Sequence, residues 1–306
     1  MSDQQVQETE TKTKAASRNP DREFDKTQLY ADIAEERQII HRDLISHCLR
    51  WSFVAMWLRK GHRYKGLKLV DVGCGKEVPL AKMVYTNKLS VEHYFGVDMN
   101  KLEIPDMLNG KKLPLTLFGS TNALDLTQES FGGPVQLITS FEVLEHMRPA
   151  HMVNLLKHLQ TWLSKGGTFI VSTPCYDAHT GAAENHVNEV THDALGAIFE
   201  ATGWAIEDHF GTFASIRDYE DQLVKDYGEG MKRAFTRLRQ FHDTNIIANM
   251  WAPLYPAQSR NCCWILHPAK DVPNYKRQFK PLSELVQPWG QSTYWNDIPA
   301  EIVSGG

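Results

Sequence analysis

The sequence predicts an α/β protein built on one open sheet, with helices on both faces. Apolar runs of strand length recur along the chain, and they end in glycine, carboxylate or hydroxyl residues. The clearest runs are 67–72, 94–97, 135–140 and 167–174. Open α/β sheets bind ligands outside the carboxyl ends of their strands, so this succession predicts a ligand site along one edge. The 306 residues, 42% of them hydrophobic, are enough to bury such a core.

Two segments precede the first predicted strand. Residues 1–26 carry almost no large apolar side chains, so folding would not offset the entropy lost on ordering them, and we expect a disordered tail. From 27 to 65 apolar residues recur at helical spacing, which predicts one or two N-terminal helices. These helices either cover the sheet and its pocket, or contact a substrate through His41, His47 and Arg50.

A glycine-rich turn follows the first strand. Asp71, Gly73 and Gly75 form a D-x-G-x-G pattern, and the absent Cβ atoms let the backbone approach a ligand closely. Such a turn alone also serves ordinary strand-to-helix connections. The second run ends in Asp98, where nucleotide-binding α/β units place the carboxylate for ribose hydroxyls. The order of these features therefore indicates a nucleotide-like ligand.

Over residues 66–204 the sequence resembles the class I S-adenosylmethionine-dependent methyltransferases, which have a Rossmann-like seven-stranded sheet. The resemblance implies that Asp71, Gly73 and Gly75 cradle the methionine part of S-adenosylmethionine. Glu77 stands where this family often has a third glycine.

The same resemblance assigns three further cofactor contacts. It implies that Asp98 holds the ribose and that Asp125, in the third motif, contacts the adenine. Ser140, at the end of the fourth strand, is the last expected cofactor-binding residue.

The residues after the fourth strand are the candidates for catalysis. If a helix begins there, Glu142, Glu145 and His146 occupy positions i, i+3 and i+4 and lie on one face. Two carboxylates and an imidazole at a strand end can bind a divalent cation or provide acid/base chemistry. The remaining interpretation is that they brace loops or the cofactor.

A histidine after the fifth strand supports the cation alternative. Glu142, Glu145, His146 and the later His186 are similar to the Glu-x-x-Glu-His motif and later histidine of metal-dependent small-RNA 2′-O-methyltransferases. Ubiquinone-pathway O-methyltransferases share the Glu-x-x-Glu-His motif. In those families the cation grips substrate hydroxyls, so the resemblance implies Mg²⁺ or Mn²⁺ bound by these four residues.

The predicted methyltransferase domain runs from 66 to 267. By the resemblance, its last two strands, at 204–213 and 261–267, form an antiparallel pair that closes the sheet. Between them lies a helical insertion, about 215–260, with several basic residues. It is either a cover that recognises the methyl acceptor or an ordinary solvated helix. Residues 268–306 are rich in Pro and Trp and are expected to wrap the surface as a C-terminal extension.

Charge and composition narrow the class of protein. The net charge of −4 gives no global basic field for non-specific nucleic-acid binding, although local basic patches keep a nucleic-acid acceptor open. Five cysteines, odd in number and without paired metal spacing, favour a reducing compartment. The sequence has neither an apolar run of about 18 residues nor an apolar signal core, so we expect a cytoplasmic protein with no membrane partner.

We therefore predict an enzyme that moves a methyl group from S-adenosylmethionine to an oxygen or nitrogen of an unidentified acceptor. Nucleic acids, nucleotides or sugars, and small molecules are the candidate acceptors. A looser resemblance to phage and prophage methyltransferases rests on 41–51 and 253–261. Two rivals are a degenerate methyltransferase acting as a scaffold, which the intact glycines disfavour, and an NAD-dependent enzyme, which Val78 disfavours because that fingerprint needs glycine there.

Overall fold

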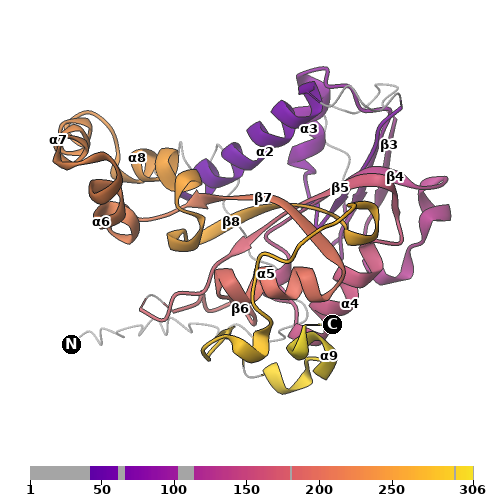
Figure 1. Ribbon diagram of the computed structural model, residues 1–306. Coiled ribbons are helices and arrows are strands. Elements are labelled where there is room, and N and C mark those ends of the chain that lie inside the picture. The colour runs from indigo at the N-terminus through magenta and orange to yellow at the C-terminus, as the bar shows by residue number, and fades with distance from the viewer. Residues whose placement is uncertain (1–41, 61–65, 103–113, 180, 293, 306) are drawn as a thin grey trace, which may run out of the picture.

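The computed structural model describes residues 42–60, 66–102, 114–179, 181–292 and 294–305 (Figure 1). Seven strands form its main sheet. From one edge to the other these are β3 (Leu115–Phe118), β2 (His93–Val97), β1 (Lys68–Val72), β4 (Val135–Phe141), β5 (Leu163–Pro174), β8 (Asn261–Pro268) and β7 (Trp204–Phe213). The predicted tail at 1–26 lies outside the described residues.

Strand directions match the predicted fold class. The neighbours β3, β2, β1, β4 and β5 are parallel, whereas β8 is antiparallel to both β5 and β7. The prediction of an α/β sheet closed by an antiparallel pair is therefore confirmed. Because the parallel strands are covered on both faces, they read in sequence as nearly continuous apolar runs.

Helices cover the two faces of the sheet (Figure 1). On one face lie α2 (Arg42–Lys60) and α3 (Pro79–Thr86), where Val54, Leu58 and Leu80 join one buried cluster. On the other lie α4 (Pro149–Leu159) and α5 (His192–Ala201), whose apolar residues belong to a second, larger cluster. Both α3 and α4 begin with a proline, which has the helical φ and lacks only an N–H that the first turn leaves unpaired.

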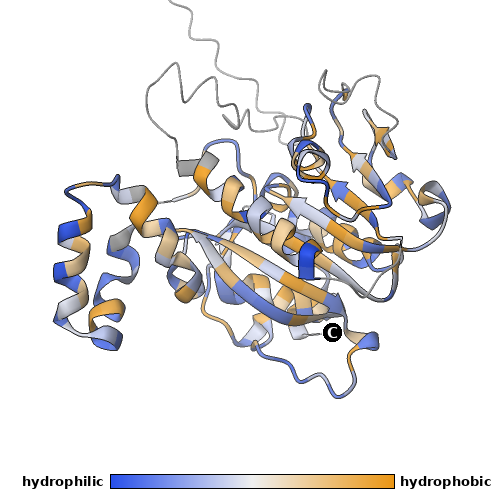
Figure 2. Cartoon of the chain, turned by 90° about the horizontal axis from the view of Figure 1, so that it is seen from above, coloured by the Kyte–Doolittle hydropathy of each residue, from blue (hydrophilic) through white to orange (hydrophobic). Residues whose placement is uncertain are grey.

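The insertion between β7 and β8 is helical, as predicted. It comprises α6 (Ile216–Tyr227), α7 (Glu229–Leu238) and α8 (Thr244–Trp251), followed by two short 3-10 helices. Gly228, with φ of +80°, separates α6 from α7. Figure 2 shows hydrophobic and hydrophilic residues along the insertion's helices, which pack around a small core of their own.

The C-terminal segment lies along the face covered by α4 and α5 (Figure 1). Its strand β9 (Gly290–Gln291) pairs antiparallel with β6 (Glu189–Val190), and it ends in α9 (Ala300–Ser304). The Glu200 carboxylate on α5 anchors it, accepting from the Tyr275 hydroxyl at 2.6 Å and from the Gln278 backbone N–H at 2.7 Å. No helix in the described ranges is long and apolar enough to cross a membrane.

Candidate active site

The glycine turn and Asp98 meet at the carboxyl edge of the sheet. Gly73 and Gly75 both have φ of +72°, a region that only glycine enters without a Cβ penalty. The Asp98 carboxylate accepts hydrogen bonds from the backbone N–H of Gly75 at 2.9 Å and of Asn100 at 2.8 Å. The carboxylate that ends β2 is therefore fixed against the turn that ends β1.

Asp71 comes just before this turn, and each of its carboxylate oxygens accepts a hydrogen bond from a neighbouring side chain. One carboxylate oxygen accepts from the Tyr94 hydroxyl at 2.5 Å and the other from Thr139 at 2.7 Å. Burial, as the main cause, raises the pKa of Asp71 to about 6, and the two hydrogen bonds oppose this rise. The side chain thus links β1 to β2 and β4, and of the two glycines after it Gly75 has open space beside it.

The two other expected cofactor contacts differ in exposure. Asp125 is exposed and ends a 3-10 helix, Ala123–Asp125, whose first turn is capped by the Asn122 side chain. Ser140 is fully buried at the end of β4, and its Oγ has no hydrogen-bond partner among the described residues.

The helix expected after the fourth strand does not form there. Glu142 has φ of +59°, and only a three-residue 3-10 helix, Leu144–His146, precedes α4. Glu142 therefore shares no helical face with Glu145 and His146. The physical reason is that its carboxylate is held by residues remote in sequence.

Those residues form a network that we call the Arg50 clamp, made of the half-buried Glu142 and the buried Arg50, Ser172, Thr212 and Asn261. Arg50 Nη1 lies 3.1 Å from Glu142 Oε1 and donates to Asn261 Oδ1 at 3.0 Å. Asn261 Nδ2 donates to both Glu142 oxygens, at 3.0 and 2.8 Å, and Ser172 donates to Oε1 at 2.8 Å. These contacts hold the Glu142 carboxylate against Arg50 on α2 and Asn261 on β8.

The other three candidates do come together. One ligand atom from each of Glu145, His146 and His186 lies within 4.8 Å of the others. Glu145 is 1% exposed; its Oε2 accepts from Thr173 at 3.0 Å, while Oε1 has no hydrogen-bond partner in the described chain. The two imidazole rings stand nearly perpendicular, with centroids 5.0 Å apart. We call these three residues the His-Glu cluster.

A carboxylate orients one of the histidines. His186 Nδ1 is hydrogen-bonded to Glu189 Oε1, at the start of β6. With the proton on Nδ1, the Nε2 lone pair is free. A carboxylate behind the imidazole is the arrangement that metal-ligating histidines usually have.

Burial sets the protonation of the cluster. The pKa of Glu145 is raised well above its usual value, first by burial and then by the nearby Glu142 charge, which Arg50 partly offsets. Burial, followed by the neighbouring His186, lowers the pKa of His146 to about 4. His146 is therefore neutral at pH 7, and a cation would stabilise the Glu145 carboxylate.

Several residues that shape the site were missing from the sequence prediction. Glu189 is one, although its spacing of three from His186 is a visible signal. Thr173 and Asn261 are two more, and they come from strands that only the sheet order brings to this edge. Of the three residues that could contact a substrate, His47 and Arg50 are buried on α2, and His41 lies outside the described residues.

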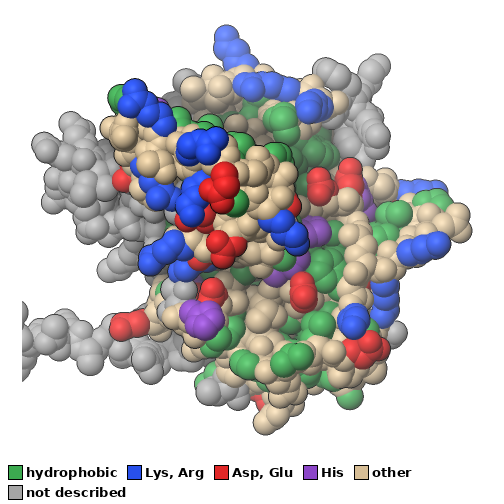
Figure 3. Space-filling model, turned by 60° about the vertical axis from the view of Figure 1, so that its left-hand side comes forward, with side chains coloured by type: hydrophobic (Ala, Val, Ile, Leu, Met, Phe, Trp, Pro, Cys, Tyr) green, Lys and Arg blue, Asp and Glu red, His purple; other side chains and the backbone are tan. Residues whose placement is uncertain are grey.

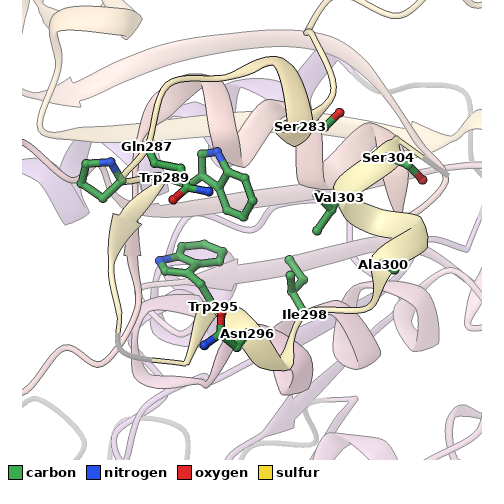
Figure 4. A pocket seen from close by; sticks show the side chains of 10 residues that line it. Ser283, Gln287, Trp289, Trp295, Asn296, Ile298, Ala300, Val303 and Ser304 are labelled. Carbon is green, nitrogen blue, oxygen red and sulfur yellow. The ribbon is translucent and has the colours of Figure 1, made fainter.

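A separate cavity of about 440 Å³ lies in the C-terminal segment (Figure 4). Two indoles, Trp289 and Trp295, form its walls with their ring centroids 5.8 Å apart. All its lining residues fall between 283 and 304, so it contains none of the predicted site residues.

Comparison with known proteins identifies one family. The family model described as a methyltransferase domain (Methyltransf_23) matches residues 33–209. No curated protein sequence matches the chain.

Several solved structures have a similar chain trace. An O-methyltransferase from a trans-AT PKS multienzyme of Brevibacillus brevis, in complex with S-adenosyl-L-homocysteine, has 14% identity and a TM-score of 0.47, covering 79% of this chain and 77% of that one. A SAM-dependent methyltransferase from Archaeoglobus fulgidus has 14% identity and a TM-score of 0.44, covering 76% and 97%. One from Mesorhizobium loti has 17% identity and a TM-score of 0.44, covering 68% and 94%. At such scores these likenesses carry no argument about activity.

Proposed function

Because the chain belongs to the methyltransferase-domain family and is thus an S-adenosylmethionine-dependent methyltransferase, we propose that it methylates a hydroxyl oxygen held at a divalent cation. The cation ligands would be Glu145, His146 and His186. Glu142, the fourth candidate from the sequence, is engaged by Arg50 and Asn261 instead.

The observation that carries this proposal is the contact between the segment 142–146 and the glycine turn. A Cβ atom placed on Gly73 would lie 2.2 Å from Val143 Cγ2, so Val143 fills the space that the glycine leaves. Glu145 and His146 follow within three residues of Val143. An acceptor bound at the His-Glu cluster would therefore be next to the glycine turn, which we expect to cradle the methionine part of the cofactor.

The donor set favours one class of cation. Two imidazoles and one carboxylate suit Mn²⁺, Fe²⁺, Co²⁺ or Zn²⁺ better than Mg²⁺, which prefers oxygen ligands in an octahedral arrangement. Glu145 Oε1, which accepts no hydrogen bond from the described residues, and His186, whose Nδ1 is bonded to Glu189, fit such an ion. We therefore favour Mn²⁺ over Mg²⁺ among the two ions expected from the sequence.

The reaction needs little covalent chemistry from the protein. A bound cation would supply Lewis acidity, which would favour the loss of the acceptor hydroxyl's proton to water. The acceptor oxygen then forms a bond to the methyl carbon, and the sulfonium sulfur takes the electron pair of the broken C–S bond. Glu145, His146 and His186 serve to fix the oxygen in line with that bond.

A second candidate mechanism uses no cation. In this mechanism His146, which is neutral at pH 7, would take the proton of a hydroxyl or amine acceptor directly, as a weak base because its pKa is lowered to about 4. This alternative predicts unchanged methyl transfer in EDTA, whereas the cation mechanism predicts its loss.

The insertion is our candidate for acceptor binding. On α7 and just beyond it, Arg233, Arg237 and Phe241 follow one another at intervals of four, all exposed, and Lys232 lies beside them. Figure 3 shows basic side chains on this side of the molecule, with acidic ones among them. Cations beside an exposed ring suit an anionic acceptor with a planar group, as in a nucleic acid or a nucleotide sugar. The cytoplasmic location and the phage likeness stay predictions.

Titrations of Mn²⁺ and of S-adenosylhomocysteine test the proposal without knowledge of the acceptor. We expect one Mn²⁺ site per chain, and a fall in its affinity of at least roughly tenfold in Glu145→Gln and His186→Ala. The affinity for S-adenosylhomocysteine should change little in both variants. His151→Ala, an exposed histidine on α4, is the matched control. Absence of Mn²⁺ binding by the wild type would overturn the cation mechanism.

A further inference from the structure

We propose that Arg50 is a positioning residue for methyl transfer, acting through Glu142 to hold the segment 142–146 against the glycine turn. Arg50 belongs to α2, about a hundred residues before that segment in the chain. This inference rests on the proposed function for its role in catalysis, and on the geometry of the Arg50 clamp for its mechanics.

Glu142 occupies a conformation that it would not adopt alone. Its φ of +59° lies in the left-handed region, which is strained for a residue with a Cβ atom. The charge and hydrogen bonds of Arg50, Ser172 and Asn261 hold its carboxylate in place and so maintain this backbone. The backbone N–H of Glu142 also donates to the Ser172 carbonyl at 3.0 Å.

The residues that follow Glu142 are those that touch the site. Val143 packs where Gly73 lacks a Cβ, and Glu145 and His146 belong to the His-Glu cluster. A change of the Glu142 backbone would therefore break the contact of Val143 with the glycine turn and displace two candidate ligands, Glu145 and His146. Stability alone does not explain the clamp, because a buried ion pair often contributes no more than a well-packed apolar pair.

The clamp also joins the insertion to the site. Thr212 stands at the end of β7, before the insertion, and Asn261 begins β8, directly after it. Thr212 Oγ1 donates to Asn261 Oδ1 at 2.6 Å, and Ser46 Oγ on α2 donates to the Thr212 carbonyl at 3.2 Å. Thr212 and Asn261, which flank the insertion, thus belong to the same clamp that holds Glu142.

The test compares four variants by hydrogen exchange and by titration with S-adenosylhomocysteine. Arg50→Met leaves the half-buried Glu142 carboxylate without its cationic partner, and Arg59→Met makes the same change at an exposed site on α2. Two double variants combine Arg50→Met with Glu142→Ala or with Glu142→Gly. Both remove the charge, but only glycine takes φ of +59° without strain.

We expect Arg50→Met to raise exchange at the amides of Glu142, His146 and Met147 by roughly tenfold, with β1 and β2 unchanged. Its affinity for S-adenosylhomocysteine should fall by about tenfold, and Arg59→Met should match the wild type. Of the double variants, the one with glycine at 142 should bind S-adenosylhomocysteine more tightly than the one with alanine.

Three outcomes would overturn the inference: unchanged exchange in the segment 142–147 of Arg50→Met, faster exchange spread equally over the sheet, or equal behaviour of the two double variants. Failure of the proposed function gives a different result. In that case the exchange changes persist, while the wild type binds neither S-adenosylhomocysteine nor Mn²⁺.

Discussion

Gly73 and Gly75 look alike in sequence and share φ of +72°, but their surroundings differ. A Cβ on Gly73 would lie 2.2 Å from Val143 Cγ2, whereas the nearest atom to a Cβ on Gly75 is 3.9 Å away. Gly75→Ala should therefore suffer only the backbone strain, about 1–2 kcal/mol. Gly73→Ala should lose more stability, and Gly73→Arg should abolish binding of S-adenosylhomocysteine. Thermal unfolding and calorimetry would check this pair, and equal effects of the two alanines would contradict it.

The buried Asp71 predicts a pH dependence. Its folded-state pKa, about 6, lies above the ordinary aspartate value of 3.8, so its contribution to stability is complete below about pH 4 and is lost as pH rises through about 6. At one pKa unit per 1.36 kcal/mol, the loss approaches about 3 kcal/mol. Urea unfolding of Asp71→Asn should show a correspondingly smaller decline between these pH values. The exposed Asp297→Asn is the control, and parallel profiles for wild type and Asp71→Asn would contradict the account.

For single residues, the sequence predicted their place along the sheet edge better than their backbone and side-chain conformations. Asp98 meets the glycine turn as expected, because parallel strands end at a common edge. Glu142 does not join the candidate ligands, because Arg50 and Asn261 determine its conformation and no local pattern reports such remote partners. His186 reaches Glu145 only through the sheet order, which the family resemblance anticipated.

At the scale of elements, the insertion has its own support. Phe235 on α7 is 1% exposed and belongs to a cluster that includes Tyr219 and Tyr255, separate from the clusters of the sheet. Phe235→Ala should cost about 3–5 kcal/mol locally and speed proteolysis within 216–258, while binding of S-adenosylhomocysteine is retained. Phe241→Ala, 64% exposed, is the matched control. An equal loss of stability in the sheet would show that the insertion does not loosen separately.

Strands and helices were predicted best where the hydrophobic pattern of the sequence is strongest. Strand β1 was predictable because Leu69, Val70 and Val72 are buried in a short run that ends in a glycine turn, although Lys68 and Asp71 interrupt its apolar residues. The edge strand β3 was missed, since its four residues are only half-buried and its pattern is weak. The helix expected to start at Glu142 begins at Pro149 instead, where proline fits the first turn.

At the scale of the whole molecule, the C-terminal segment contacts the strand that positions His186. Strand β9 pairs with β6, whose Glu189 orients His186. A Cβ on Gly290 would lie 2.1 Å from the Glu189 carbonyl oxygen, so Gly290→Ala should force the two strands apart. We expect the affinity for Mn²⁺ to fall by roughly tenfold. Gly230→Ala, with no atom closer than 3.8 Å, is the control, and unchanged Mn²⁺ affinity in Gly290→Ala would separate the segment from the site.

The central claim is that the glycine turn and the His-Glu cluster form one site. The direct measurement is the NMR linewidth of S-adenosylmethionine, labelled with ¹³C at the transferred methyl, as Mn²⁺ is added to the protein. The account predicts strong paramagnetic broadening of the methyl signal in the wild type, and its loss in His186→Ala. A methyl signal that stays sharp while both the cofactor and Mn²⁺ are bound would contradict it.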